Sequence, residues 1–410
     1  MMWTSHQLNP AATILAFLWV TAMAMGTPVR ADTSTGRGDW NGIVQQASGQ
    51  VVYFNAWGGE LAINRYIEWA GARLQSEYGI ELKHVKVTDI AEAVTRIMAE
   101  RAAGRDRQGS VDLLWINGEN FAALKQAGLL YGPWTELLPN ARSVDWYGNP
   151  TTRIDVTLAT AGFELPWGTA ALTLFYDTTQ VSAAPRDPAA LLRWIEAHPG
   201  RFSYPQPPAF LGSAFLKQML LLMVDDADRL QRPAGEDFDR VTEPLWRWLD
   251  QAHDGMWRRG RLFPPSGAAQ RELLAVGELD WMLSYNPSEA SRAIAQGELQ
   301  ASIAALRFAG GALANSHFLA IPYNSGAKAA AMVAANFLLS PQAQLRKADE
   351  RYWGDPSVLD LSRLEAEDRR AFDVLRGGPA TPPPGGTLLP EPHPSWTTRL
   401  EHTWLARYVR

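Results

Sequence analysis

The sequence predicts an α/β protein with two lobes, each built on a mostly parallel sheet flanked by helices. Strand-like apolar runs alternate with helix-like periodic runs between Val51 and Ile116. Strands that alternate with helices in this way usually pair in parallel, with right-handed crossovers. The length of 410 residues also favours more than one folding unit. A chain this long can bury a large hydrophobic core.

The first lobe is expected to begin with a strand at 51–55, which a helix follows. The apolar face of that helix repeats with a period of 3.6 residues and ends at Gly79, a typical helix terminator. A second strand at 82–87 precedes a helix that opens on a capping-box pattern. The third strand, 110–116, ends at the polar sequence Asn-Gly-Glu-Asn.

The second lobe is expected to hold residues 164–301. It contains a strand at 170–176, a Pro- and aromatic-rich loop that opens a helix at 216–224, and a late strand at 280–285. The segment 299–322 reads as two short strands around a Gly-Gly turn that return the chain to the first lobe. The predicted division is a signal peptide at 1–31, a flexible mature N-terminus at 32–46, lobe one at 47–163 and 302–410, and lobe two at 164–301.

Composition excludes several classes of protein. The net charge of −5 and the absence of a Lys/Arg-rich run argue against a nucleic-acid surface. The chain has no cysteine, which excludes disulfides, thiolate metal sites and an N-terminal lipid anchor on cysteine. The seven histidines lack metal-ligand spacing, and the phosphate-loop, dinucleotide and nucleophile-elbow motifs are absent. The sequence therefore predicts no metal site, no cofactor and no catalytic residues.

The N-terminus predicts export. Ala11–Met25 is an apolar block, shorter than the ~20 residues of a membrane span. Val29-Arg30-Ala31 fits the small-residue rule for signal-peptide cleavage after Ala31. No Lys or Arg precedes the block, so an uncleaved anchor or a frayed apolar terminus is the alternative. These features favour a soluble protein of a bacterial periplasm.

An ordered series of motifs gives a resemblance to a known family. The series runs YFNAWGG, SVDLLWINGENFAALKQAGLLYGPW, ELPWGTAALTLFYDTT, PGRFSYPQPPAFLGSAF, GELDWMLSYNPSE, HFLAIPYNSGAK and AANFLLSPQAQ. It resembles the family 1 extracellular solute-binding proteins of ABC importers, and within them the YnjB-like subgroup. The likeness covers about Val51 to Leu345.

The resemblance implies a two-lobed fold like that of type II periplasmic binding proteins, with a hinge of crossing strands. Such a receptor closes on one small solute and delivers it to a membrane permease driven by an ATPase. The expected receptor is a monomer that binds no nucleic acid. The rival interpretation is an exported glycan-active hydrolase that uses carboxylates such as Glu60, Glu119 or Glu289.

Candidate ligand-binding residues lie at strand ends, because ligands of open α/β sheets bind past the carboxyl ends of strands. The first-lobe candidates are Trp57, Gly58, Gly59, Glu60, Asn117, Glu119 and Asn120. The crossing and return segments add Trp167, Thr169 and Asn315, and the second lobe adds Tyr204, Ser213, Phe215, Tyr285, Asn286 and Ser288.

Each candidate also has a purely structural interpretation. Asn117 and Asn120 could cap backbone groups, Glu60 could pair with a helix dipole, and Ser213 could be a helix cap. Trp57, Trp167 and the neighbouring His317 could pack in a core. The glutamates with Trp57 and Trp167 would suit an organic cation such as a polyamine or a thiamine-like compound. The main alternative is an anion held by the Gly58–Gly59 backbone.

Overall fold

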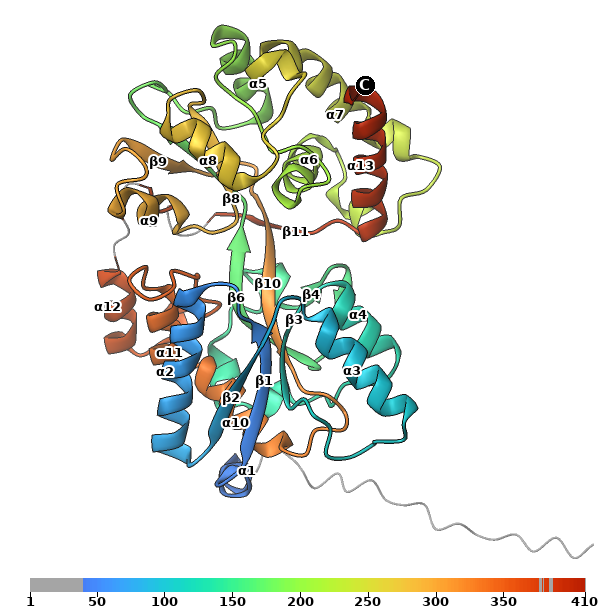
Figure 1. The fold of residues 1–410 in the computed structure, drawn as a ribbon, viewed down its shortest axis with the longest axis vertical. Helices are drawn as coiled ribbons and strands as arrows, with labels where there is room; N and C mark the ends of the chain where they lie inside the picture. Colours follow the sequence, from blue (N-terminus) through green and yellow to red (C-terminus); the bar gives the residue numbers. More distant parts are fainter. Residues whose placement is uncertain (1–39, 376–377, 379, 383–385, 410) are drawn as a thin grey trace, which may run out of the picture. The chain divides into compact units, whose positions relative to one another are not determined.

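The computed structural model describes residues 40–375, 378, 380–382 and 386–409 (Figure 1). The predicted signal peptide lies outside the described residues, as do positions 32–39. Residues 40–46, expected in a flexible segment, instead form most of helix α1 (Trp40–Ala47). Trp40, Ile43 and Val44 recur at helical spacing and pack against the first core, which explains why this segment is ordered.

The first sheet has six strands in the order β11-β10-β3-β1-β2, with β6 on the other edge of β10. The strands β1 (Val51–Trp57), β2 (Glu81–Val87) and β3 (Leu113–Ile116) pair in parallel, as predicted. β10 (Ala312–Ala320) runs antiparallel to β3 and to β6 (Glu164–Ala171). β11 (Leu388–Pro390) is parallel to β10. The sheet is therefore mixed.

Helices cover both faces of this sheet (Figure 1). One face packs against α1, α2 (Leu61–Tyr78), α10 (Lys328–Leu338) and α11 (Pro341–Ala348), and the other against α3 (Ala91–Ala102) and α4 (Glu119–Gln126). Helix α2 ends at Gly79, whose φ of 67° is left-handed, a conformation that glycine adopts without strain. Helices α2 and α4 begin just past the carboxyl ends of β1 and β3.

The second sheet, in the order β8-β7-β9, is smaller and entirely antiparallel. The prediction of a mostly parallel sheet in each lobe is wrong here. β7 (Thr173–Asp177) follows β6 almost directly, while β8 (Trp281–Ser284) and β9 (Ile303–Leu306) are joined through helix α9 (Glu289–Ala295). This crossover puts β8 and β9 on either side of β7, so the central strand runs against both neighbours.

The second core lies between this sheet and its helices. These are α5 (Pro188–Ala197), α6 (Phe210–Met223), α7 (Phe238–Gly255) and α8 (Gly267–Ala275). Helix α6 begins at Phe210, before the predicted 216–224. The side chains Trp396, Leu400 and Trp404 of α13 (Pro394–Tyr408) are buried in this second core. The expected division assigns 302–410 to lobe one, whereas the packing joins α13 to the other half.

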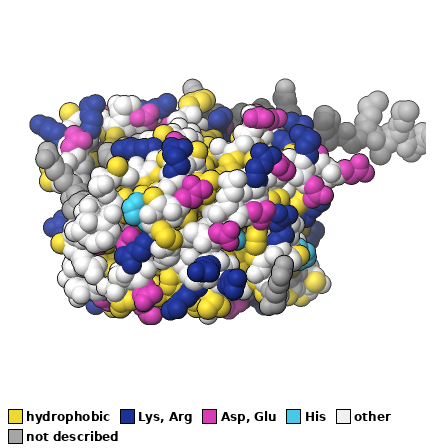
Figure 2. Space-filling model, turned by 90° about the horizontal axis from the view of Figure 1, so that it is seen from above, with side chains coloured by type: hydrophobic (Ala, Val, Ile, Leu, Met, Phe, Trp, Pro, Cys, Tyr) yellow, Lys and Arg dark blue, Asp and Glu magenta, His cyan; other side chains and the backbone are white. Residues whose placement is uncertain are grey.

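The remaining elements are short or peripheral. They are α12 (Ala366–Val374), β4 (Ile154–Asp155), β5 (Leu158–Ala159) and the 3₁₀ turns η1 (Thr135–Leu137), η2 (Pro139–Ser143), η3 (Pro150–Thr152), η4 (Ala227–Gln231), η5 (Trp257–Gly260) and η6 (Leu361–Arg363). Within the described part of the chain, no helix combines the length and apolar character that crossing a membrane requires. The face seen in Figure 2 carries interspersed acidic and basic side chains.

Candidate ligand-binding site

A gap in the first sheet marks the candidate site. β3 pairs with β10 at 318–320, and β11 pairs with it at 312–314. Between them, Asn315, Ser316 and His317 pair with β6, and among the described strands none pairs with them on the opposite edge. β3 runs antiparallel to β10 and β11 runs parallel to it, so both strands direct their carboxyl ends at this gap. Ligands of α/β sheets bind at such ends.

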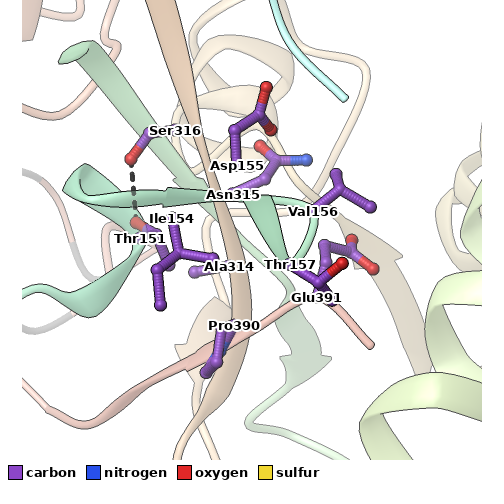
Figure 3. A pocket seen from close by; sticks show the side chains of 10 residues that line it. All are labelled: Thr151, Ile154, Asp155, Val156, Thr157, Ala314, Asn315, Ser316, Pro390 and Glu391. Atoms are coloured by element: carbon purple, nitrogen blue, oxygen red, sulfur yellow. Dashed lines mark hydrogen bonds between the residues drawn. The ribbon is translucent and has the colours of Figure 1, made fainter. Parts of the chain in front are cut away.

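A narrow pocket lies at this gap (Figure 3). Residues from β10, from the β4–β5 hairpin and from the chain after β11 line it. They are Thr151, Ile154, Asp155, Val156, Thr157, Ala314, Asn315, Ser316, Pro390 and Glu391. Segments far apart in sequence thus build one small polar pocket.

Asp155 provides a buried carboxylate in the pocket, with only 3% of its surface exposed. Its Oδ2 accepts a hydrogen bond from the Gly118 backbone N–H at 2.5 Å, and no cationic side chain pairs with it among the described residues. Burial raises the pKa of Asp155 to about 7; the Gly118 N–H opposes this rise, and the negative charge of Glu391 adds to it. Near neutral pH the ionised and neutral forms of the Asp155 carboxyl group are therefore both populated.

The backbone that carries Asp155 is strained. Val156 and Thr157 follow it with φ values of 40° and 72°. Left-handed φ is rare for β-branched residues and persists where the surrounding structure enforces it, often beside a binding site. Gly118 also has a positive φ of 63°, which lets its N–H point at the carboxylate. The turn therefore orients Asp155 at an energetic cost.

Glu391 is held by residues of the second half. Lys217 in α6 donates from Nζ to Glu391 Oε2 at 2.5 Å, and Tyr285, after β8, donates its hydroxyl to Oε1 at 3.2 Å. The side chains of Lys217 and Glu391 are each 10% exposed, so solvent screens this ion pair weakly. Burial, with the nearby negative charge of Glu391, raises the pKa of Tyr285.

A chain of hydroxyl and amide groups forms one wall. The hydroxyls of Ser316 and Thr151 are hydrogen-bonded at 2.8 Å, and Thr151 donates to Asn149 Oδ1 at 2.7 Å. Asn149 Nδ2 in turn donates to Thr169 Oγ1 at 3.3 Å. Thr169, a predicted ligand contact, is thus buried behind the pocket wall and bonded to it.

The structure brings some predicted site residues to this region. Asn315 lines the pocket, and Tyr285 reaches it through Glu391. Asn117, half-buried, and Asn120 flank Gly118 and Glu119 at the carboxyl end of β3. Glu119 is exposed and does not line the pocket.

Four predicted contacts are buried in the protein interior instead. Trp167, Tyr204 and Phe215 have no exposed surface. Trp167 packs edge-on against Trp115 in the first half, whereas Tyr204 stacks on Phe215 in the second core. Ser213 donates its hydroxyl to Glu401 Oε1 of α13 at 2.5 Å. These contacts favour the structural interpretation of the four residues, since large aromatic side chains in apolar segments gain more from burial than from exposure at a cleft. Their role as ligand contacts stays a prediction.

The other predicted residues make contacts within the protein. Glu60, at the N-terminus of α2, forms an ion pair with Arg292 of α9 in the other half. Ser288 donates to the Gly354 carbonyl at 2.9 Å, and Asn286 accepts from the Ser288 N–H at 3.0 Å. Trp57 is 42% exposed and lies against Gly59, where an added Cβ would meet its ring at 2.4 Å. The Glu60–Arg292 ion pair and the Ser288–Gly354 hydrogen bond join the two halves on the α2 side.

The N–H of Gly58 donates to the Val87 carbonyl at 3.1 Å. The backbone of the Gly58–Gly59 turn is thus partly engaged within the sheet.

Sequence reasoning missed Asp155, Glu391 and Lys217. Asp155 ends the two-residue strand β4 and Glu391 follows β11, 236 positions later, so only tertiary pairing brings them together. Lys217 does carry a signal, since it is a charged residue within the apolar helix FLGSAFLKQMLLLM. Among the described residues, no group of three or more His, Asp or Glu side chains is placed to hold a metal ion.

Comparison with known proteins identifies the family. Residues 69–367 match the family model described as bacterial extracellular solute-binding protein. The chain is 47% identical over 376 residues to Protein YnjB of Escherichia coli (strain K12), covering 92% of this chain and 95% of that protein. The chain belongs to the bacterial extracellular solute-binding proteins. It is a solute-binding protein of ABC transporters, and its sequence resemblance to this family is confirmed.

Solved structures show the same fold. The spermidine/putrescine ABC transporter substrate-binding protein PotD from Streptococcus pneumoniae matches with a TM-score of 0.60 and 12% identity, over 88% of this chain and 98% of that one. The Bordetella ferric binding protein matches with a TM-score of 0.58 and 16% identity, over 88% and 98%. The solute-binding protein therefore has the fold of type II periplasmic binding proteins, as expected.

Members of this family bind small solutes and work with a permease and an ATPase. The family is extracellular, which in bacteria corresponds to the periplasm. The family assignment favours the receptor over the exported hydrolase.

Proposed function

We propose that this solute-binding protein captures a small organic cation in the pocket around Asp155. The observation that carries the proposal is a buried carboxylate in the pocket lining that has no cationic side chain as a partner among the described residues. A buried carboxylate is costly unless a positive charge accompanies it. A bound ammonium group supplies that charge.

The charge balance of the pocket supports a cation over an anion. Lys217 neutralises Glu391, and Asp155 leaves a surplus negative charge. An anionic solute would add a like charge within a small, weakly screened pocket. The earlier anion candidate, the Gly58–Gly59 turn, is weakened because the Gly58 N–H already donates to Val87. Glu60 and Glu289, the earlier cation candidates, instead contact Arg292 and Arg271 of the protein.

The solute is captured by closure of the two halves. Asp155 belongs to the first half, whereas Lys217 and Tyr285 belong to the second and hold Glu391 at the same pocket. A ligand that contacts both halves stabilises the closed arrangement relative to the open one. The Glu60–Arg292 and Ser288–Gly354 contacts join the halves on the α2 side and add to the closed state.

The receptor acts as a monomer in the periplasm, without catalysis, and passes its solute to an inner-membrane permease. We expect the solute to be small, because the pocket is narrow in this structure. A micromolar receptor needs only about 8 kcal/mol of binding free energy. One charge-assisted contact with several hydrogen bonds and apolar contacts can supply it.

The test is calorimetric titration of the full mature protein with putrescine, choline and thiamine as cationic probes. We expect Asp155→Asn to weaken binding of each cation that the wild type binds by at least tenfold, because the variant keeps the shape and loses the charge. Glu119→Gln is the matched control, since Glu119 is exposed outside the pocket. Equal affinities in wild type and Asp155→Asn, or a larger loss in Glu119→Gln, would overturn the assignment.

The hydrolase alternative is tested in the same samples. Chitosan and cello-oligosaccharides are incubated with the wild type, and the reducing ends are assayed. Thermal stabilisation without release of reducing ends supports the receptor, and turnover of a glycan contradicts it.

A further inference from the structure

We infer that the bound cation also carries a carboxamide or ureido group, which pairs with the main chain of Ser316. This inference rests on the proposed function, because it concerns a second contact of the same solute. It follows from the direction of the backbone groups in β10 at the sheet gap.

The direction of these groups is fixed by hydrogen bonds at the start of β10. The Ala312 N–H donates to Thr387 before β11, at 2.9 Å, so Ala312 faces the β11 edge. The Leu313 carbonyl accepts from Leu172 at 2.8 Å, so Leu313 faces the β6 edge. In a strand, successive residues direct their N–H and C=O groups to opposite edges. Ser316 therefore directs both groups to the edge that β3 and β11 share.

At that edge no described strand pairs with Ser316. β11 pairing ends at Ala314 and β3 pairing starts at Phe318. The pairing register between β10 and β6 shifts between His317 and Phe318, because Trp167 of β6 has no partner residue in β10. The extra residue belongs to β6, so the N–H and C=O groups of β10 still alternate between its two edges. The Ser316 side chain is bonded to Thr151 and does not use these main-chain groups. One N–H and one C=O thus face the pocket, which Ser316 lines.

A buried backbone donor and acceptor without partners destabilise the protein unless water or a ligand satisfies them. A ligand group that bonds both needs an acceptor for the Ser316 N–H and, beside it, a donor for the Ser316 C=O. A carboxamide or ureido group offers both. A carboxylate offers only acceptors, and it would face the Ser316 carbonyl and the Asp155 carboxylate. The pocket therefore selects an amino amide over an amino acid anion or a simple amine.

The experiment compares three ligand series by calorimetry, each with two to five methylene groups between its functional groups. These are ω-amino carboxamides, n-alkylamines and ω-amino carboxylates. We expect the best carboxamide to bind at least fivefold more tightly than the best alkylamine and the best amino carboxylate. A smaller difference, or a preference for the carboxylate, would overturn the inference.

Failure of the two proposals gives different results. If amines and amides bind alike and both weaken in Asp155→Asn, the cation site stands and the carboxamide contact fails. If no amine or amide binds, or if Asp155→Asn leaves their binding unchanged, the cation assignment itself fails, and this inference with it.

Two variants of Ser316 separate the main chain from the side chain. Ser316→Ala removes the hydroxyl and keeps the backbone groups, so the fivefold preference is expected to remain. Ser316→Pro removes the N–H that faces the gap, a position that tolerates proline because that edge is unpaired. This variant is expected to lose the preference. Loss of the carboxamide preference in Ser316→Ala would contradict the inference. If Ser316→Pro does not fold, the comparison of the three ligand series on the wild type decides the inference.

Discussion

At the scale of single residues, one carboxyl group determines the chemistry of the pocket. Asp155 is buried, faces Glu391 in the pocket and Glu164 in β6, and accepts one backbone hydrogen bond. Burial and the negative charge of Glu391 disfavour its ionised form, and the Gly118 N–H only partly compensates. The empty pocket therefore favours a neutral Asp155, whereas a bound cation favours the carboxylate.

The first prediction concerns stability without ligand. The pKa of Asp155 is about 7 in the folded protein, against an ordinary 3.8, so this group stabilises the fold below about pH 4. That contribution is lost as the pH rises through about 7 and amounts to about 4 kcal/mol at most. Between pH 4 and 8 the free energy of unfolding should fall more steeply in wild type than in Asp155→Asn. Urea titrations check this, and parallel pH profiles would contradict it.

Cation binding has the opposite dependence on pH. Only ionised Asp155 attracts the solute, so affinity should rise with pH and level off above about 7. Below about pH 6 the affinity should fall about tenfold per pH unit, since the ionised fraction falls at that rate. Calorimetry with a quaternary ammonium probe, which does not titrate, measures this dependence. A flat profile from pH 5 to 8 rules out Asp155 as the counter-ion.

The second prediction concerns Lys217, which lies in the apolar helix α6 and pairs with Glu391. Lys217→Met should lower the free energy of unfolding by about 3 kcal/mol, because Glu391 is left with an unpaired, largely buried charge. Lys217→Met combined with Glu391→Gln should recover more than half of this loss, since the stranded charge is gone. A loss below 1 kcal/mol in the single variant, measured by urea unfolding, would contradict a structural role for the pair.

At the scale of elements, periodicity predicted the first half well. The order β1, α2, β2, α3, β3 follows from apolar spacing and from local end signals such as Gly79. The antiparallel direction of the second sheet could not be predicted in this way, because it depends on which strand enters between β8 and β9. The gap beside β10 could not be predicted either, because it depends on where two strands distant in sequence, β3 and β11, stop pairing with β10.

The third prediction concerns the contact between α9 and the chain after α11. Gly354 has a φ of 84°, and a Cβ there would lie 1.9 Å from Ser288 Oγ. Gly354→Ala should therefore push the two halves apart and weaken solute binding by at least fivefold. Gly277→Ala is the matched control, because Gly277 has a similar φ of 73° and open space around it.

Both glycine variants carry similar backbone strain, so thermal melts should show comparable losses of stability without ligand. The difference in affinity then reports the contact alone. Equal affinities in the two variants would show that the Ser288–Gly354 contact does not contribute to closure.

At the scale of the whole molecule, the C-terminal helix completes the second core. Trp404 of α13 is fully buried and donates its indole N–H to the Tyr204 hydroxyl at 2.7 Å. Tyr204 also bonds His253 at 2.8 Å, so α13 is connected to α7 through this tyrosine. The expected division placed residues 302–410 in lobe one, because sequence spacing alone does not say which half a C-terminal helix packs against.

The fourth prediction follows from that packing. Trp404→Ala should lower the free energy of unfolding by about 3–5 kcal/mol, the usual cost of removing a buried Trp. Tyr147→Ala is the control, since Tyr147 is 78% exposed and its loss should change stability by less than about 0.5 kcal/mol. Similar stabilities of the two variants in urea would show that α13 is dispensable to the fold.

The central claim is that Asp155 holds an organic cation between the two halves. Mass spectrometry of small molecules released by denaturing protein isolated from the cell envelope tests it most directly. The account predicts one organic cation from the wild type and little or none from Asp155→Asn prepared alongside. Recovery of an anion, or of the same solute in equal amounts from both proteins, would contradict it.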